Sequence, residues 1–294
     1  MQISKAVLIT PDELRQMLER DRDKVLIVDA RSWHEYRSGH VPGAVNMDLF
    51  AFHWADTSPE GIEGFNSSLE MLLRSTGVTY DKRIVFYDDI TGTLAARGLW
   101  LMHYISHNDA MVLDGGLSWW VRQGYELEDE PSRPSPVHGG YTYRFNGDVL
   151  ATYRYILERL GDPRVRMVDA RSSEEYHGLY VRASRGGHIP GAVNVNWEMN
   201  VMRDGRMKPV EQLRRVYSSI LYSRGSEQGG DEGRKGRDDY DYDYEYEYEI
   251  ICYCQGGYRA AHAYLALRLL GINHVRVYLG SWYEWGNRHE LPVE

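Results

Sequence analysis

The chain has 294 residues, of which 43% are hydrophobic and 26% are charged, and its net charge is −9. Its two cysteines, Cys252 and Cys254, are too few for a disulfide framework, so we expect a reducing, cytoplasmic location. Seven acidic residues and no basic ones fall within positions 238–249, and the remainder is almost neutral, so no nucleic-acid or membrane partner is indicated. No apolar run approaches the ~18 residues of a membrane span, and the first residues do not resemble a secretory signal.

The predicted elements of the first half alternate between helices and strands. Thr10-Pro11-Asp12-Glu13 has the residues of a helix start, with a capping Thr, Pro at the first helical position and Glu three residues after the cap. Apolar runs at residues 25–28 and 83–87 are typical of buried strands, and residues 94–104 have the apolar spacing of a helix. This alternation predicts an α/β fold in which a mainly parallel sheet is covered by helices on both faces.

A proline-rich segment divides the chain. Residues 131–136 (Pro-Ser-Arg-Pro-Ser-Pro) have the composition of a stiff, extended linker. We therefore predict a first domain at residues 1–130, a linker at 131–139 and a second domain at 140–294. Glycine- and charge-rich residues at 223–249, which end in alternating tyrosines and acids, predict a mostly disordered, solvated insertion. A docking surface for a basic partner is the alternative.

The second half repeats the first. Four blocks recur in the same order, which indicates an internal duplication, and the second copy carries eight extra residues between the first two blocks. The paired blocks are Val28-Asp29-Ala30-Arg31-Ser32 with Val168-Asp169-Ala170-Arg171-Ser172, Gly39-His40-Val41-Pro42-Gly43-Ala44-Val45-Asn46 with Gly187-His188-Ile189-Pro190-Gly191-Ala192-Val193-Asn194, Ile84-Val85-Phe86-Tyr87-Asp88 with Ile250-Ile251-Cys252-Tyr253-Cys254, and Gly115 and Trp120 with Gly280 and Trp285.

The third block places Cys254 on a strand-to-helix turn. Glycines in such a turn let successive N–H groups converge into an anion nest, and the helix N-terminus adds partial positive charge. Both features favour the thiolate, which is the nucleophilic form of cysteine. Arg259 adds a fixed charge whose forked donors suit an oxyanion. We therefore predict Cys254 as the nucleophile and the loop after it as the substrate-binding segment, formed by Gln255, Gly256, Gly257, Tyr258 and Arg259.

These motifs together resemble tandem-domain rhodaneses, which are sulfurtransferases. The resemblance rests on Cys-x-x-Gly-x-Arg at 254–259, the two Asp-Ala-Arg blocks, the Gly-His-Ile-Pro-Gly-Ala-Val-Asn block and the closing residues 280–285. It implies that Cys254 attacks the outer sulfur of thiosulfate and passes it, as a persulfide, to cyanide or a thiol. Related cell-cycle phosphatases have five residues between Cys and Arg. The four residues here favour sulfur over phosphate or arsenate.

The sulfur donor is less well defined, because residues 255–257 match neither thiosulfate-preferring nor mercaptopyruvate-preferring relatives. Relatives also use an arginine six residues after the Asp of the Asp-Ala-Arg block, where this chain has Glu175. We predict Arg185 as its substitute in substrate binding. Asp169 and Arg171 are expected to brace the loop as a buried pair.

Asp88 occupies the place of the cysteine in the first half, where a carboxylate cannot form a persulfide, so we predict an inactive first domain whose loop is one residue longer. Cys252 is expected to be a buried strand residue, with a resolving thiol as the alternative. The resemblance implies a monomer without metal or cofactor. Its partners would be a small sulfur donor and a cyanide, thiol or thioredoxin-like protein acceptor. Mercaptopyruvate sulfurtransferase and persulfide carrier are the alternative functions.

Overall fold

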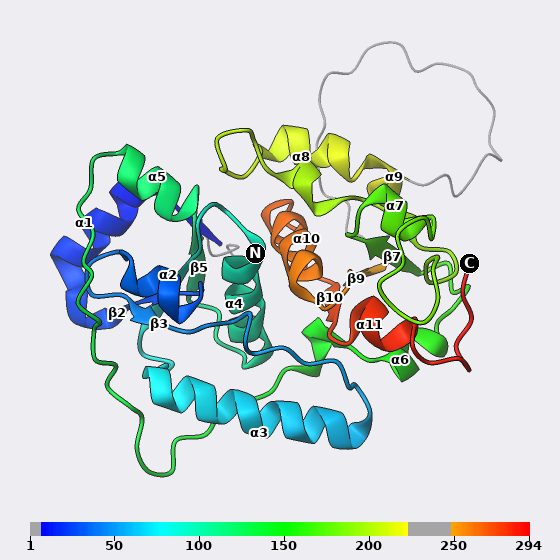
Figure 1. Cartoon of the computed structure of the whole chain (residues 1–294), viewed down its shortest axis with the longest axis horizontal. Coiled ribbons are helices and arrows are strands. Elements are labelled where there is room, and N and C mark those ends of the chain that lie inside the picture. Colours follow the sequence, from blue (N-terminus) through cyan, green and yellow to red (C-terminus); the bar gives the residue numbers. More distant parts are fainter. Residues whose placement is uncertain (1–6, 223–247) are drawn as a thin grey trace.

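A computed structural model describes residues 7–222 and 248–294, which form two five-stranded sheets (Figure 1). Every strand pair in these sheets is parallel, and the strand order is equivalent in the two halves, as expected from an internal duplication. The first sheet has the order β1 (Leu8–Ile9), β5 (Ala110–Leu113), β4 (Arg83–Tyr87), β2 (Val25–Asp29), β3 (Val45–Asn46), and the second has β6 (Leu150–Ala151), β10 (Val275–Tyr278), β9 (Glu249–Tyr253), β7 (Val165–Asp169), β8 (Val193–Asn194).

Helices cover both faces of each sheet. The helix start predicted at Thr10 is confirmed, because Thr10 and Glu13 form a capping box at the first helix. The helices of the first half are α1 (Pro11–Asp21), η1 (Arg22–Lys24), α2 (Trp33–Arg37), α3 (Pro59–Thr76), α4 (Thr93–Tyr104) and α5 (Gly116–Arg122). Those of the second half are η2 (Gly147–Val149), α6 (Tyr153–Leu157), α7 (Ser173–Tyr176), η3 (Trp197–Asn200), α8 (Val210–Val216), α9 (Ser218–Leu221), α10 (Tyr258–Leu269) and α11 (Ser281–Trp285).

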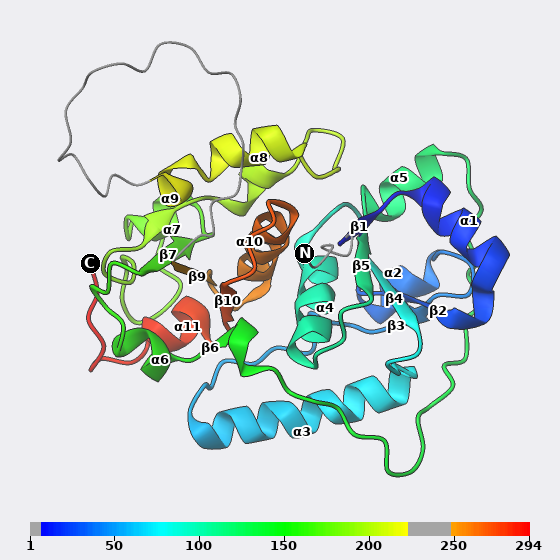
Figure 2. The same cartoon turned by 180° about the vertical axis from the view of Figure 1, so that it is seen from behind.

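Successive side chains on the central strands point to opposite faces of the sheet and so enter two different hydrophobic cores. On β9, Ile250 and Cys252 enter a cluster that also includes residues of the first half, whereas Ile251 and Tyr253 face a separate cluster on the other side of the sheet. The shared cluster forms where α4 packs against α10, and the two helices lie side by side in both views (Figures 1 and 2). The two sheets are therefore joined through one continuous core.

The segment that connects the halves has no regular secondary structure between residues 129 and 146. It runs along the first half: Val137 N–H donates to Arg74 O (2.9 Å), Tyr143 OH to Val78 O (2.8 Å) and Asn146 N–H to Tyr104 O (2.6 Å). Its last residues thus pack against the ends of α3 and α4 before the second half begins. The predicted boundaries at 130 and 139 stay a prediction.

The predicted insertion at residues 223–249 lies outside the described residues except for Tyr248 and Glu249. Tyr248 donates its hydroxyl to Leu221 O (3.1 Å), and Glu249 opens β9. Among the described residues, none of the helices has the length and apolar character needed to cross a membrane.

Candidate active site

Cys254 directly follows β9, and the chain turns at Gly257 into α10. Gly257 has φ = 88°, a left-handed conformation that glycine adopts without a steric penalty. This turn directs the Gly257 N–H to the Cys254 Sγ at 3.1 Å. Only 1% of Cys254 is exposed. The sulfur is therefore held at a helix N-terminus with one backbone donor already facing it.

The start of α11 holds the loop in place from the neighbouring strand end. Cys254 N–H donates to Ser281 Oγ (3.2 Å), while the N–H groups of Trp282 and Tyr283 donate to the carbonyls of Cys254 and Gln255 (both 2.9 Å). Both backbone groups of Cys254 are thereby satisfied by α11. The position of the sulfur is fixed by backbone geometry as well as by packing.

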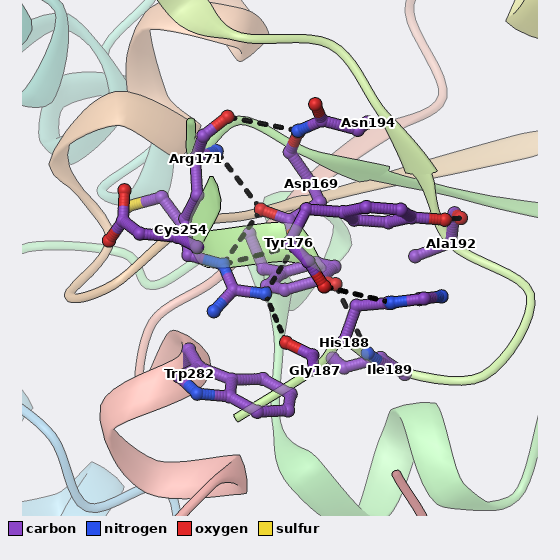
Figure 3. Close-up of polar contacts among 12 residues, drawn as sticks. Asp169, Arg171, Tyr176, Gly187, His188, Ile189, Ala192, Asn194, Cys254 and Trp282 are labelled. Atoms are coloured by element: carbon purple, nitrogen blue, oxygen red, sulfur yellow. Dashed lines mark hydrogen bonds and ion pairs between the residues drawn. The ribbon is translucent and has the colours of Figure 1, made fainter. Parts of the chain in front are cut away.

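Asp169 and Arg171 form the buried pair expected from the sequence, with 0% and 1% exposure (Figure 3). Arg171 Nε donates to Asp169 Oδ1 (2.9 Å), and Nη2 donates to Asp169 Oδ2 (2.6 Å) and to Gly187 O (2.8 Å). The guanidinium carbon lies 4.4 Å from the centre of the Trp282 ring. Trp282 in turn donates its N–H to Cys254 O. The Asp169–Arg171 pair therefore supports the cysteine loop through Trp282, and neither residue lines the cavity described below.

Arg259 does not present its fork freely to the cavity, because Glu175 already binds it. Arg259 Nη1 and Nη2 donate to the two carboxylate oxygens of Glu175 at 2.5 and 2.9 Å. Burial opposes the charged forms, but the ion pair prevails: it raises the pKa of Arg259 and lowers the pKa of Glu175. Glu175 also lies 3.6 Å from Arg182. One carboxylate therefore offsets only one of the two arginine charges next to the cysteine loop.

Arg185, predicted to bind substrate, has its donors engaged elsewhere. Its guanidinium donates to the carbonyls of Trp285 (3.0 Å), Gly286 (3.3 Å), Arg288 (2.5 Å) and Leu291 (2.8 Å). These bonds tie the segment before Gly187 to the last residues of the chain, because an arginine can satisfy several orphan carbonyls at a helix end. Arg185 is absent from the cavity lining, whereas Arg182 is part of it. The structure thus assigns Arg185 a bracing position.

A cavity of about 660 Å³ opens beside Cys254, and both halves of the chain line it. Gln255 and Tyr258 reach its wall, and their binding of substrate stays a prediction: Gln255 Nε2 donates to Arg182 O (2.9 Å), and the Tyr258 hydroxyl donates to Phe50 O (3.2 Å). His53 lies close to Gly256: a Cβ placed on Gly256 would lie 2.7 Å from His53 Cε1. The lining residues are Phe50, His53, Thr93, Leu94, Arg182, Cys254, Gln255, Gly256, Tyr258, Arg259 and Tyr283.

Sequence reasoning missed the lining residues that come from the first half, together with Arg182 and Tyr283. Phe50 and His53 lie between two recurring blocks, in a loop whose length and pattern carry no local signal of a site. Arg182 lies within the eight extra residues of the second copy, so that insertion was the available signal. Thr93 and Leu94 begin α4, the helix after the Asp88 loop, and their place in the cavity wall follows only from the packing of α4 against α10.

The equivalent loop of the first half is occupied by its own carboxylate. Asp88 is buried and accepts N–H groups from Gly92 (3.0 Å), Leu94 (3.0 Å) and Ala95 (3.1 Å) at the start of α4. The loop has one more residue than its counterpart, as predicted, because four residues separate Asp88 from α4 and three separate Cys254 from α10. Asp88 therefore occupies the anion position of its own turn.

Cys252 is fully buried and enters the shared core, on the same side of β9 as Cys254. Burial raises the pKa of Cys252, and a charge on Cys254 would raise it further, so Cys252 remains a neutral thiol. His188 stacks on Tyr176 at 3.7 Å, and His262 lies buried between Asn200 and Thr91. These side chains therefore have packing partners of their own.

Comparison with known proteins places this arrangement in a family. The rhodanese-like domain matches residues 10–123 and 152–288. The chain is 32% identical over 288 residues to the thiosulfate sulfurtransferase of Pseudomonas aeruginosa, covering 98% of this chain and 97% of that protein. It is 30% identical over 300 residues to the sulfur carrier protein TtuD of Thermus thermophilus, with 98% and 96% covered.

A solved structure has the same architecture over nearly its whole length. The crystal structure of SseA from Escherichia coli, described as showing the rhodanese fold and catalytic mechanism of 3-mercaptopyruvate sulfotransferases, matches with a TM-score of 0.70 at 27% identity. The match covers 95% of this chain and 99% of SseA. The strand order, the duplicated Asp-Ala-Arg blocks and the cysteine turn thus agree with the sequence comparison, and the chain belongs to the rhodanese-like domain family, with two copies of that domain in tandem.

Proposed function

We propose that this chain is a thiosulfate sulfurtransferase that carries sulfane sulfur on Cys254. The observation that carries the proposal is the position of the Cys254 sulfur, which lies against the Gly257 N–H at a helix N-terminus and lines a cavity of about 660 Å³. A thiolate in this position is a nucleophile with access to a small anion. The relatives of this chain include a protein named thiosulfate sulfurtransferase.

In the first half-reaction, the Cys254 thiolate attacks the outer sulfur of thiosulfate. A new S–S bond forms, the original S–S bond breaks, and sulfite leaves with the electron pair of that bond. In the second, cyanide or a thiolate attacks the outer sulfur of the persulfide. The product is thiocyanate or a new persulfide, and the Cys254 thiolate is restored. The cycle needs no external oxidant or reductant.

The surrounding donors suit an anionic sulfur donor of small size. Arg182 and Arg259 line the cavity, and the Gly257 N–H points at the reacting sulfur. 3-Mercaptopyruvate is also a small anion and is the second candidate donor, since SseA, whose fold this chain shares, is a 3-mercaptopyruvate sulfotransferase. The two donors differ in the leaving group, which is sulfite in one case and pyruvate in the other, so product analysis separates them.

A role as sulfur carrier is the second candidate function, favoured by the rim of the cavity. Phe50 and Tyr283 are 71% and 49% exposed at its wall, and Leu179 and Tyr180, just before Arg182, are 80% and 60% exposed. Exposed apolar side chains around a reactive thiol suit docking of a thiol-bearing protein such as a thioredoxin-like acceptor. TtuD, a relative of this chain, is named as a sulfur carrier protein.

We further propose a cytoplasmic monomer in which residues 1–130 form the non-catalytic domain and residues 140–294 the catalytic one. A reducing compartment would keep the buried pair of free thiols, Cys252 and Cys254, available as thiols. A measured mass of about one chain in solution and location of a tagged chain in the cytoplasm would test these two points.

The test of the main proposal combines donor assays with mass spectrometry. Wild type, Cys254→Ser and Cys252→Ala are assayed for thiocyanate from thiosulfate and cyanide, and for pyruvate from mercaptopyruvate. We expect turnover in wild type and in Cys252→Ala and none in Cys254→Ser. With thiosulfate alone, the wild-type protein should gain ~32 Da, one sulfur atom, on Cys254.

Three outcomes would contradict the proposal in whole or in part. Thiocyanate formation by Cys254→Ser would exclude Cys254 as the sulfur carrier. A persulfide that forms with mercaptopyruvate and not with thiosulfate would assign the donor to the second candidate. A persulfide that forms but passes its sulfur only to a thiol-bearing protein, and not to cyanide, would favour the carrier function.

A further inference from the structure

Arg97 is a buried cation without a hydrogen-bond acceptor. It lies on α4 of the first half, and its exposure is 0%. None of its three guanidinium nitrogens has a hydrogen-bond acceptor in residues 7–222 and 248–294. Burial of an unpaired guanidinium is costly, so a site of this kind calls for an anion. Nothing in the local sequence of α4 supplies one.

The guanidinium of Arg97 lies against the cysteine loop of the second half. A Cβ placed on Gly257 would lie 2.6 Å from Arg97 Nη1. The guanidinium can therefore approach the backbone of the loop this closely only because residue 257 has no side chain. The same residue donates its N–H to the Cys254 sulfur at 3.1 Å. The guanidinium also lies 5.3 Å from the Tyr258 ring and 4.8 Å from the Trp100 ring, which hold it in place.

The charges around this point leave Arg97 uncompensated. The groups that interact electrostatically with Arg97 are Tyr258, Cys254 and His53, none of them a carboxylate. Burial lowers the pKa of Arg97 to about 10, while Tyr258 and Cys254 act in the opposite direction. The guanidinium therefore stays protonated at neutral pH despite its burial.

The other groups that face the sulfur do not replace Arg97. Cys254 interacts electrostatically with Arg259, Tyr258 and Cys252 besides Arg97. Arg259 is paired with the Glu175 carboxylate, Tyr258 is neutral, and Cys252 is a neutral buried thiol. Among the described groups facing the sulfur, Arg97 is thus the cation that no carboxylate offsets.

We propose that Arg97 of the non-catalytic domain is the buried counter-charge that stabilises the thiolate and persulfide forms of Cys254. This inference rests on the proposed function, and it adds that the inactive copy supplies part of the electrostatics of the active one. Arg97 faces the sulfur through the loop and lies outside the cavity lining, so it acts on the reacting sulfur and not on the donor. Its loss should therefore alter the reactivity of the thiol more than the KM for thiosulfate.

The test measures the rate of Cys254 alkylation by iodoacetamide as a function of pH, in a Cys252→Ala background that leaves one thiol. Arg97→Met removes the charge and keeps an unbranched apolar side chain, whereas Arg97→Lys keeps the charge. We expect the midpoint of the pH profile to rise by about one to two pH units in Arg97→Met, and to remain within about half a unit in Arg97→Lys. The rate of persulfide formation near neutral pH should fall by about tenfold or more in Arg97→Met.

Arg83→Met is the matched control. Arg83 begins β4, at the end of the strand away from the Asp88 turn and α4, and it pairs with Asp109 at 3.0 Å. It should leave the alkylation midpoint unchanged. Circular dichroism and thermal melting establish that each variant is folded. A folded Arg97→Met protein with the wild-type midpoint would overturn the inference, and so would a folded Arg97→Lys protein whose midpoint rises as far as charge loss predicts.

Two further results keep this inference separate from the proposed function. If wild type forms no Cys254 persulfide with either donor, the proposed function fails regardless of Arg97. If wild type forms the persulfide, and Arg97→Met leaves both the alkylation midpoint and the rate of persulfide formation at their wild-type values, the inference fails alone.

Discussion

Glu284 connects the two halves next to Tyr283, which lines the cavity, and its removal should both destabilise the protein and loosen the site. The side chain follows Tyr283 on α11, and Glu284 is 5% exposed. Its carboxylate accepts the N–H of Thr57 (2.8 Å), the hydroxyl of Thr57 (2.5 Å) and the hydroxyl of Tyr278 (2.8 Å), and it pairs more loosely with Arg288 (3.4 Å). Thr57 belongs to the first half and lies four residues beyond His53, so this carboxylate anchors the loop that carries His53.

The expected cost follows mainly from the three bonds to Thr57 and Tyr278, because Arg288 has other carboxylate partners in Asp56 and Glu290. In Glu284→Ala the Thr57 N–H and two hydroxyls lose their acceptor in a buried region, and each loss costs about 1–3 kcal/mol. The two hydroxyls can rotate toward other acceptors, so we expect a net loss of about 3–4 kcal/mol of unfolding free energy. Glu284→Gln keeps one acceptor oxygen but turns an amide toward the remaining donors, and it should cost about half as much.

Urea unfolding measures this cost, and donor kinetics measure its effect on the site. We expect both Glu284 variants to unfold at lower urea concentration and to show a raised KM for thiosulfate, because the loop of Phe50 and His53 loses its anchor. Glu290→Gln is the control: its side chain is exposed and pairs with Arg288 at 3.4 Å, so it should unfold at the wild-type midpoint. Unfolding of Glu284→Ala within about 1 kcal/mol of wild type, with an unchanged KM, would refute this account.

Three further predictions concern the two loops. Gly257→Ala should lose about 2 kcal/mol or more, because φ = 88° disfavours a side chain and its Cβ would lie 2.6 Å from Arg97 Nη1; a stable, fully active variant would contradict this. Burial raises the pKa of Asp88 from 3.8 to about 7 although three N–H groups lower it, so the stability it contributes is present below about pH 4 and is lost as pH rises through about 7. The unfolding free energy of Asp88→Asn minus that of wild type should therefore increase by about 2 kcal/mol as the pH rises from about 5 to about 8. A difference that does not change with pH would exclude this assignment. Glu175→Gln frees the Arg259 fork and should lower the KM for thiosulfate by about three- to tenfold; an equal or higher KM would show that the fork does not reach the donor.

The local features of this fold could be predicted from the sequence because they depend on neighbouring residues. Strand alternation placed Cys252 and Cys254 on one side of β9, and the repeat identified the shorter cysteine loop and its longer counterpart at Asp88. The buried Asp169–Arg171 pair was likewise expected, since a short motif with both charges at a strand end satisfies itself. These inferences needed only periodicity, turn chemistry and comparison of the halves.

The composite wall of the site could not be predicted in the same way. Phe50 and His53 reach the cavity because α4 packs against α10, a contact between segments more than 150 residues apart for which the sequence has no local pattern. The prediction that Arg185 binds substrate did not anticipate that four carbonyls near the end of the chain take up its donors. The pairing of Arg259 with Glu175 could not be predicted either. The resemblance shows only that Glu175 stands where relatives have an arginine, and it does not indicate which residue Glu175 contacts.

Helix α10 is buried along residues 260–267, on every side and not along a single stripe. An amphipathic helix could lie on the surface of a separate domain, but a helix covered all round needs a neighbour on each face. Here α4 of the first half is that neighbour. The second half without the first would therefore expose the face of α10 to water, and we expect a fragment of residues 140–294 to aggregate unless residues 1–130 are supplied with it. Aggregation of this fragment would show that the first copy, which has Asp88 in place of the cysteine, serves as a folding partner of the second.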